Sequence, residues 1–247
     1  MNSLLLVRAH ARIALLDLFR SPSYVVPTIL FPAMFFALFD LPIARTRASI
    51  ADFATLAFIA WAIVGVAVYQ FGVGIAQERG RPWERYQRTL PVSTSVRFAA
   101  RSVCALVFGA LAAACVASVA RLFTPIDLTV WQWLQVFVYA IGAGVPFVLF
   151  GIAIGYWSPA RAAVPIATAC NLLLAYAGGL WMPPQYLPDA VARISPFLPT
   201  RQFADLLWSV TGGAFPTAAV AGLAAYTLAF GCLAVVGYRR DERTRYA

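Results

Sequence analysis

Lysine is absent from the 247-residue sequence, so all nineteen basic residues are arginine. The phosphate-cradling loop Gly-x-x-x-x-Gly-Lys-Ser/Thr requires a lysine, and its absence excludes that ATP-binding motif. The single histidine, His10, lies near the N-terminus, outside the apolar segments. Because an active site usually brings several His, Asp, Glu or Ser side chains to one point, the sequence predicts no catalytic residue and no enzyme activity for this chain.

Cysteine is scarce and unpatterned. The four cysteines form no Cys-x-x-Cys pair and no cluster with the histidine, which predicts neither a metal site nor a disulfide framework. They are expected to pack as small apolar side chains inside hydrophobic segments. Their positions are Cys104, Cys115, Cys170 and Cys232.

Charge is scarce as well: 12% of residues are charged, 62% are hydrophobic, and the mean hydropathy is +0.76. A soluble domain of this length cannot hide so much apolar surface, since average composition is nearer half apolar. Continuous apolar runs of about 20 residues predict spanning helices, whereas a β-barrel would show alternation. The expected fold is an all-α integral membrane protein with six spans. They lie at approximately Pro22–Phe39, Phe53–Ala76, Phe98–Ala120, Trp131–Tyr156, Ala163–Met182 and Ala214–Tyr238.

The arginines orient these spans. With the N-terminus inside, thirteen arginines lie on the cytoplasmic side, five lie on the opposite side, and Arg101 falls near a boundary inside the third span. The positive-inside rule therefore predicts that both termini are cytoplasmic. This distribution accounts for most of the net charge of +9, so nucleic-acid binding is not expected.

Residues 1–21 are expected to form a separate N-terminal helix, because no Gly or Pro precedes Pro22 and Leu and Ala are frequent. Arg8 and Arg12 share one side of the helix, while His10 and Asp17 fall nearly opposite. We expect this helix to lie in the cytoplasmic headgroup layer before the single six-span domain of residues 22–247. A simple cytoplasmic extension is the alternative, since the amphipathic pattern is ragged.

A charged island, residues 77–91, separates the second and third apolar runs with the sequence QERGRPWERYQRTLP. It interleaves acids and aromatic residues with its arginines, which the positive-inside rule alone does not require. We therefore expect this island to contact a soluble partner. A solvated basic loop that serves only membrane topology is the alternative.

Two segments of the chain resemble the type-2 ABC exporter permeases. The first is similar to the family's cytoplasmic loop between the second and third spans, with Leu90 inserted between Thr and Pro. It comprises Glu78-Arg79-Gly80, Trp83-Glu84-Arg85 and Thr89-Leu90-Pro91-Val92-Ser93. The second segment, GGLWMPPQYLP at residues 178–188 with SPFLPTRQFAD at residues 195–205, resembles the end of the family's fifth span and the return toward the sixth. The resemblance implies a partly re-entrant external helical segment at residues 183–211.

The resemblance also implies a function. The chain would be the permease subunit of an ATP-driven exporter in the bacterial inner membrane, moving an amphiphilic or hydrophobic substrate such as a drug-like compound or a lipid. Two separate ABC ATPase subunits would bind ATP and Mg²⁺, and a second permease, identical or related, would complete the transporter. No cofactor or metal is expected on this chain itself.

The resemblance further implies that the loop at residues 77–97 acts as the coupling element, as a short amphipathic helix in a groove of each ATPase. Buried aromatic residues and arginines usually dominate such contacts. The residues expected to make this contact are Glu78, Arg79, Gly80, Trp83, Glu84, Arg85, Tyr86 and Arg88.

A substrate path is expected along the second and fifth spans, which in the family line the interface between the two permeases. The polar or amphipathic residues available there are Tyr69, Gln70, Thr168, Asn171 and Tyr176. Polar groups within spans face protein or a cavity rather than lipid. Interhelical hydrogen bonds, worth about 0.6 kcal/mol each, explain the same residues equally well, and the sequence leaves both roles open.

Small residues form further patterns, which are expected to permit close helix packing or kinks rather than ligand binding. They are Gly142-Ala143-Gly144, Gly151-x-x-x-Gly155 and Gly178-Gly179. Other functions remain as alternatives: a permease for lipid-linked glycans, a stand-alone channel or a membrane scaffold. A channel should line its pore with rings of polar or charged residues, and no predicted span carries such a stripe.

Overall fold

The computed structural model describes residues 3–79 and 94–246, and within these ranges the secondary structure is helical with no strand. Among these described residues, six helical stretches are long and apolar enough to cross a membrane. They are Val26–Ala44, Ala48–Arg79, Val96–Phe123, Val130–Trp157, Ala160–Ala177 and Thr217–Arg243. Each overlaps one predicted span, so the predicted all-α, six-span membrane fold is confirmed.

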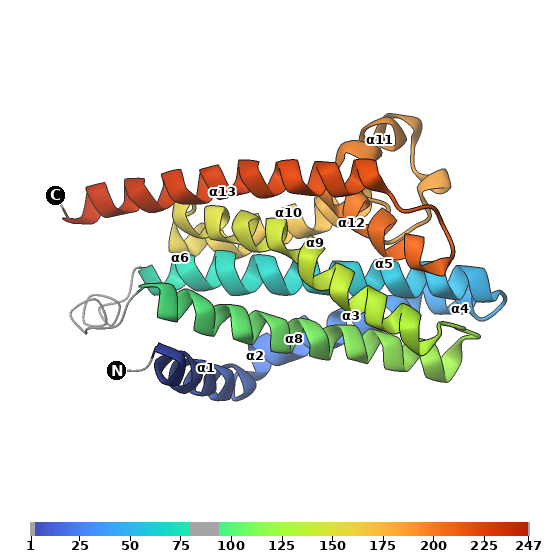
Figure 1. Cartoon of the computed structure of the whole chain (residues 1–247), viewed down its shortest axis with the longest axis horizontal. Helices are drawn as coiled ribbons and strands as arrows, with labels where there is room; N and C mark the ends of the chain where they lie inside the picture. The colour runs from blue at the N-terminus through green and yellow to red at the C-terminus, as the bar shows by residue number, and fades with distance from the viewer. Residues whose placement is uncertain (1–2, 80–93, 247) are drawn as a thin grey trace.

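The spans lie alongside one another, and both chain termini emerge at the same end of the bundle (Figure 1). We call this the terminal end and the opposite one the far end. The second span begins at the far end and finishes at the terminal end. It comprises α5 (Ala48–Ala67), the π-helical segment η3 (Val68–Val73) and α6 (Gly74–Arg79). The third, fourth, fifth and sixth spans are α8 (Thr94–Phe123), α9 (Val130–Trp157), α10 (Ala160–Ala177) and α13 (Thr217–Tyr246).

The N-terminal helix α1 (Ser3–Phe19) lies against α8 near the terminal end. The first span comes next as a series of short helical turns. They are α2 (Pro22–Val25), η1 (Val26–Leu30), α3 (Phe31–Phe35), η2 (Phe36–Asp40) and α4 (Leu41–Ala44). Pro27 and Pro32 lie in η1 and α3, and each removes one backbone donor. The two π-helical segments are a local adjustment of the kind that lets membrane helices accept proline.

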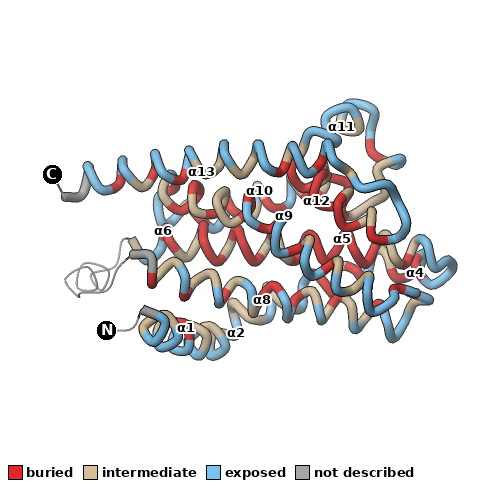
Figure 2. The backbone as a smooth tube through the Cα atoms, viewed as in Figure 1, coloured by how far each residue is buried: buried red, intermediate tan, exposed pale blue. Residues whose placement is uncertain are grey.

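The second span forms the centre of the bundle. In its most hydrophobic stretch 72% of the residues are buried, compared with 17% in the first and sixth spans. Figure 2 shows this central position as an almost continuous buried stretch along α5. Fully buried aromatic side chains fill the space around it, including Phe58 of α5, Phe108 of α8 and Phe147 of α9. The second span is therefore the element that touches most of the others.

The fourth span approaches the second very closely at two glycines. A Cβ atom built on Gly151 would lie 2.7 Å from the carbonyl oxygen of Ala67, and one on Gly155 would lie 2.8 Å from Cβ of Ile75. Only glycine fits such a backbone approach without displacing a helix. The Gly151-x-x-x-Gly155 pattern thus serves helix packing, as the sequence predicts.

The fifth span ends at Ala177, five residues before the predicted end at Met182. Gly178 forms the C-cap, and Gly179 comes next with a φ of +74°. This left-handed backbone turns the chain out of the helix at low steric cost only because the residue is glycine. The predicted span extends too far because the Leu-Trp-Met after the two glycines is apolar.

Short helices connect the fifth and sixth spans at the far end (Figure 1). They are η4 (Pro184–Tyr186), α11 (Asp189–Ile194), η5 (Ser195–Phe197), α12 (Pro199–Trp208) and η6 (Ser209–Thr211). Helix α12 is largely buried and packs against α5, α9 and α13. Its first turn is fixed by Thr200, whose hydroxyl donates to the carbonyl of Leu174 at 2.6 Å. Its last turn is fixed by Trp208, whose indole Nε1 donates to the carbonyl of Phe53 at 3.1 Å.

Candidate coupling site and transport path

The predicted coupling residues divide between described and undescribed parts of the chain. Glu78 and Arg79 form the last two residues of α6, at the terminal end of the second span. The remaining six predictions lie outside the described residues: Gly80, Trp83, Glu84, Arg85, Tyr86 and Arg88. Their contact with an ATPase stays a prediction, while the structure shows how the segment that carries them is attached to the bundle.

Arg79 is turned inward, and its side chain is only 11% exposed. Its Nη1 lies 2.6 Å from Oδ1 of Asp241 on α13 and also donates to the carbonyl of Tyr156 at 3.0 Å. Its Nη2 donates to the carbonyl of Ser158 at 2.7 Å. Asp241 is 7% exposed, so both partners of this charge pair are shielded from solvent. One guanidinium group therefore joins the end of the second span to the fourth-to-fifth turn and to the sixth span.

Glu78 points to another neighbour. Its Oε2 accepts a charge-assisted hydrogen bond from Nη2 of Arg101, which lies on α8 about two turns from the start of that helix. Glu78 is half exposed, whereas Arg101 is mostly buried. Two consecutive residues of α6 thus bind the second span to the third on one side, and to the fourth span, the turn that follows it and the sixth span on the other.

A second contact reinforces the sixth span at this end. The indole Nε1 of Trp157, the last residue of α9, donates to the carbonyl of Leu233 at 3.1 Å. The guanidinium carbon of Arg240 lies 5.1 Å from the centre of the same ring, a favourable cation–π distance. Gly237 makes room for the indole, since a Cβ there would lie 2.7 Å from Nε1 of Trp157. The terminal part of α13 is therefore held to α9 as well as to Arg79.

Sequence reasoning missed Asp241 and Arg101 as members of this site. In the sequence, Asp241 is only an acid near the C-terminus, and Arg101 is only a residue near a span boundary. An arginine inside an apolar run was the available signal, because a charge at that depth requires a partner. The partner itself lies 23 positions away for Arg101, and Asp241 lies 162 positions from Arg79.

The predicted path residues separate into two groups. The hydroxyl oxygens of Tyr69 and Thr168 lie 2.7 Å apart, so they join the second span to the fifth directly. Asn171 is buried one helical turn farther along α10 and faces the second span at Gly65. The structure brings these three side chains together between the two spans. Their role in cargo transport stays a prediction.

Gln70 and Tyr176 lie apart from that group. Gln70 is buried and accepts a short hydrogen bond from the hydroxyl of Tyr24, beside the start of the first span. Tyr176 lies in the last turn of α10 and is half buried. Consecutive residues on a helix point in different directions, which separates Gln70 from Tyr69 although they are neighbours in sequence.

A modest stability effect is expected for the hydrogen bond between Tyr69 and Thr168. Replacing Tyr69 with Phe removes only the hydroxyl and should lower the free energy of unfolding by about 0.6 kcal/mol. A double-mutant cycle with Thr168→Val in detergent micelles measures the coupling between the two residues. Additive losses from the two substitutions would contradict a direct bond.

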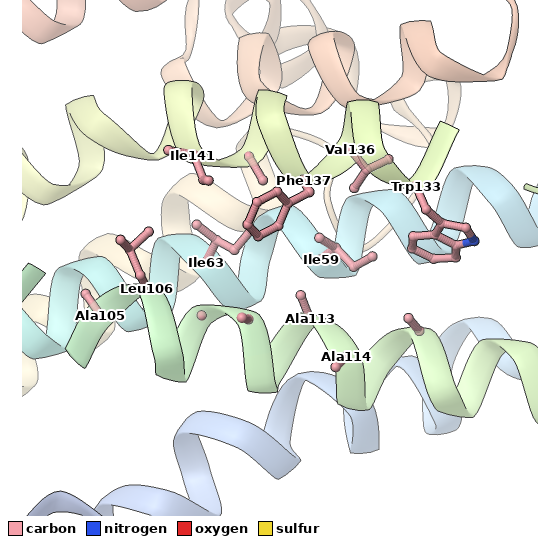
Figure 3. Close-up of a pocket in the computed structure, with 14 residues that line it drawn as sticks. Ile59, Ile63, Ala105, Leu106, Ala113, Ala114, Trp133, Val136, Phe137 and Ile141 are labelled. Carbon is pink, nitrogen blue, oxygen red and sulfur yellow. The ribbon is translucent and has the colours of Figure 1, made fainter. Parts of the chain in front are cut away.

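An apolar groove of about 370 Å³ lies between α5, α8 and α9 (Figure 3). Small residues of α8, among them Ala113 and Ala114, form its floor, while Ile63, Phe137 and Ile141 form its walls. This volume falls within the range of about 300–1,000 Å³ typical of small-molecule sites. None of the predicted path residues lines the groove, and its chemistry suits only an apolar group.

These observations define a multi-pass membrane protein, and comparison with known proteins specifies its family. A family model described as "ABC-2 type transporter" matches residues 6–211. The chain is also 24% identical over 228 residues to the Bacillus subtilis (strain 168) protein named "Putative transport permease YvfS". That alignment covers 90% of this chain and 93% of the relative. The chain belongs to the ABC-2 type transporter family, and this membership implies association with ABC ATPase subunits.

Proposed function

We propose that this chain is the membrane-spanning subunit of an ATP-driven exporter in the bacterial inner membrane. Two ABC ATPase subunits bind ATP and Mg²⁺ and hydrolyse the ATP, and a second permease, identical or related, completes the transporter. The terminal end of the bundle faces the cytoplasm, where the ATPases are available. The coupling loop at residues 77–97 transmits their motion to the spans.

The paired attachment of Glu78 and Arg79 is the observation that carries this proposal. The segment that holds the other six predicted ATPase contacts begins directly after these residues. Glu78 is bound to the third span, and Arg79 is bound to the fourth-to-fifth turn and the sixth span. A displacement of the loop therefore acts on most of the bundle rather than on one flexible connection.

The cargo proposed is an amphiphilic or hydrophobic molecule, such as a drug-like compound or a lipid. The polar groups between the second and fifth spans are few, and Tyr69 and Thr168 already satisfy each other. No cluster of three or more His, Cys, Asp or Glu that could hold a metal ion occurs among the described residues. A path with so little fixed charge favours cargo that does not require charge pairing.

Replacing Trp83 with Ala tests the proposed coupling. Tryptophan anchors at protein interfaces typically contribute about 2 kcal/mol or more, so the affinity for the ATPase should fall at least about 30-fold. The measurement is the amount of ATPase that copurifies with the permease, together with ATP-dependent transport in proteoliposomes. Unchanged copurification and unchanged transport would refute the proposed contact.

Trp131→Ala is the matched control. Trp131 is exposed at the first turn of α9, at the far end of the bundle, so its loss should leave ATPase association intact. Glu78→Arg is a less specific test, because it breaks the pair with Arg101 and also places two cations together. A loss of copurification or transport in Glu78→Arg could therefore arise from the broken contact with the third span as well as from a lost ATPase contact.

A further inference from the structure

A second groove, of about 590 Å³, lies along one face of the N-terminal helix α1 where it meets α8. Most of its lining is apolar, and Val103 is the residue that α8 contributes. Two arginines, Arg8 and Arg12, are the charged members of the lining. They are four residues apart, so both project from the same face of the helix. The groove thus combines positive charge with apolar surface.

No carboxylate of the described residues neutralises the charge in this groove. Among the described residues, neither Arg8 nor Arg12 forms an ion pair with a carboxylate. Asp17, the acidic residue of α1, lies nearly opposite them around the helix. Two cations that share one face without a counter-charge favour an anionic ligand.

Apolar side chains line the whole length of the groove on α1, but charge is confined to one part of it. Both arginines line the N-terminal half, beside Leu4 and Val7, whereas Leu15, Leu16 and Phe19 line the half that leads into the first span. The protein leaves the side chains of Leu16 and Phe19 exposed. Exposed apolar side chains that lie together mark a surface that binds another apolar group. The groove therefore matches a ligand with an anionic head and an apolar tail.

The inclination of α1 places the apolar half of the groove deeper in the membrane. Cys104 of α8 lies beside Ala11, with its Sγ 3.9 Å from the Ala11 carbonyl oxygen, and the rings of Phe19 and Phe108 are 4.9 Å apart. From Ala11 to Phe19, α1 covers eight residues, which is about 12 Å at a rise of 1.5 Å per residue. Alongside them, α8 covers only the four residues from Cys104 to Phe108, which is about 6 Å. Helix α1 crosses α8 obliquely and descends toward the membrane interior.

We propose that this groove binds one anionic phospholipid from the leaflet at the terminal end. The phosphate lies between Arg8 and Arg12, near the level of Val103 on α8, and an acyl chain runs along Leu16 and Phe19. The lipid joins α1 to the first half of α8, the helix that begins directly after the predicted coupling residues. An acidic protein surface would meet the two arginines but has no tail to cover the apolar half. This inference goes beyond the proposed function and is independent of the cargo.

Native mass spectrometry of the permease with its ATPase subunits tests the site. Palmitoyl-oleoyl phosphatidylglycerol is titrated into the detergent-solubilised complex, and the matched phosphatidylcholine serves as the neutral probe. The wild type should bind phosphatidylglycerol in preference. Because each arginine near the membrane surface contributes roughly 1 kcal/mol, the double variant Arg8→Gln/Arg12→Gln should lose about 30-fold in phosphatidylglycerol affinity.

Three further variants make the test specific. Arg20→Gln removes a charge of the same N-terminal region outside the groove lining and should retain the wild-type affinity. Val103→Trp fills the groove from the α8 side and should weaken binding while both arginines remain. Arg8→Lys/Arg12→Lys keeps the charge and should retain most of the phosphatidylglycerol binding. If the glutamine variant does not fold, the lysine variant and Val103→Trp together test the site.

Equal affinity of the wild type for the two lipids would overturn the proposal, and so would equal phosphatidylglycerol affinity in the wild type and the charge-removed variant. If Arg8→Gln/Arg12→Gln instead loses ATPase subunits while it retains phosphatidylglycerol, the groove faces an acidic protein surface and the lipid assignment is wrong. Lipid binding is measured without transport. A failure here is therefore distinct from a failure of the proposed exporter function.

Discussion

Replacing Arg79 with Ala should lower the free energy of unfolding by about 3–5 kcal/mol, because it removes one partner of a buried ion pair. The Arg79 and Asp241 side chains are 11% and 7% exposed, so solvent screens the pair weakly. The substitution also removes the donors to the carbonyls of Tyr156 and Ser158. Thermal unfolding of the purified permease in detergent, monitored by helical circular dichroism, measures the loss.

The same substitution should also uncouple transport from ATP hydrolysis. If Arg79 transmits motion from the loop to the sixth span, Asp241→Asn should reproduce the transport defect while the ATPase still copurifies. Arg243→Gln, a change at an exposed site two residues along α13, is the matched control and should behave as the wild type. Additive effects of Arg79→Ala and Asp241→Asn in a double-mutant cycle would contradict a direct coupling between them.

Replacing Gly151 with Ala should destabilise the bundle by about 2–3 kcal/mol, although it adds a single methyl group. The new Cβ would lie 2.7 Å from the Ala67 carbonyl oxygen and 3.1 Å from Cβ of Phe71. The nearest atom belongs to the backbone, so no side-chain rotation can relieve the overlap. Helix α9 must move away from the second span, and thermal unfolding in detergent should report the change.

Gly142 provides a control within the same helix. A Cβ atom at Gly142 would meet nothing within 4 Å. Since alanine favours a helix over glycine by about 0.8–1 kcal/mol, Gly142→Ala should be neutral or slightly stabilising. Equal losses of stability for Gly142→Ala and Gly151→Ala would show that the effect is a property of α9 itself and not of its contact with the second span.

The membrane class could be predicted from composition because the transfer of an apolar segment into lipid is a local property of the chain. Each of the six spans adds its own hydrophobic free energy, so it is visible without knowledge of its neighbours. Boundaries were less certain. The fifth span continues into apolar Leu180-Trp181-Met182, and only the left-handed backbone at Gly179 shows where its helix ends.

The candidate site was only partly predictable. The island after the second span identified Glu78 and Arg79 as charged residues at a span end. A charged segment has the same composition whether it contacts a soluble partner or another span of the same chain. The structure binds both residues internally, to Arg101 and Asp241, and the ATPase contact of the predicted coupling residues stays a prediction.

Hydrophobicity and charge act over short stretches of chain, so the sequence predicts six spanning helices and a charged segment after the second of them. Helix packing, in contrast, brings Arg79 to Asp241 across 162 positions and places Arg8 and Arg12 of α1 in one groove with Val103 of α8. Such contacts between residues far apart in sequence depend on how the spans pack, for example on the close approach of α9 to the second span at Gly151. The free energy of packing belongs to pairs of helices and is not contained in either sequence segment alone.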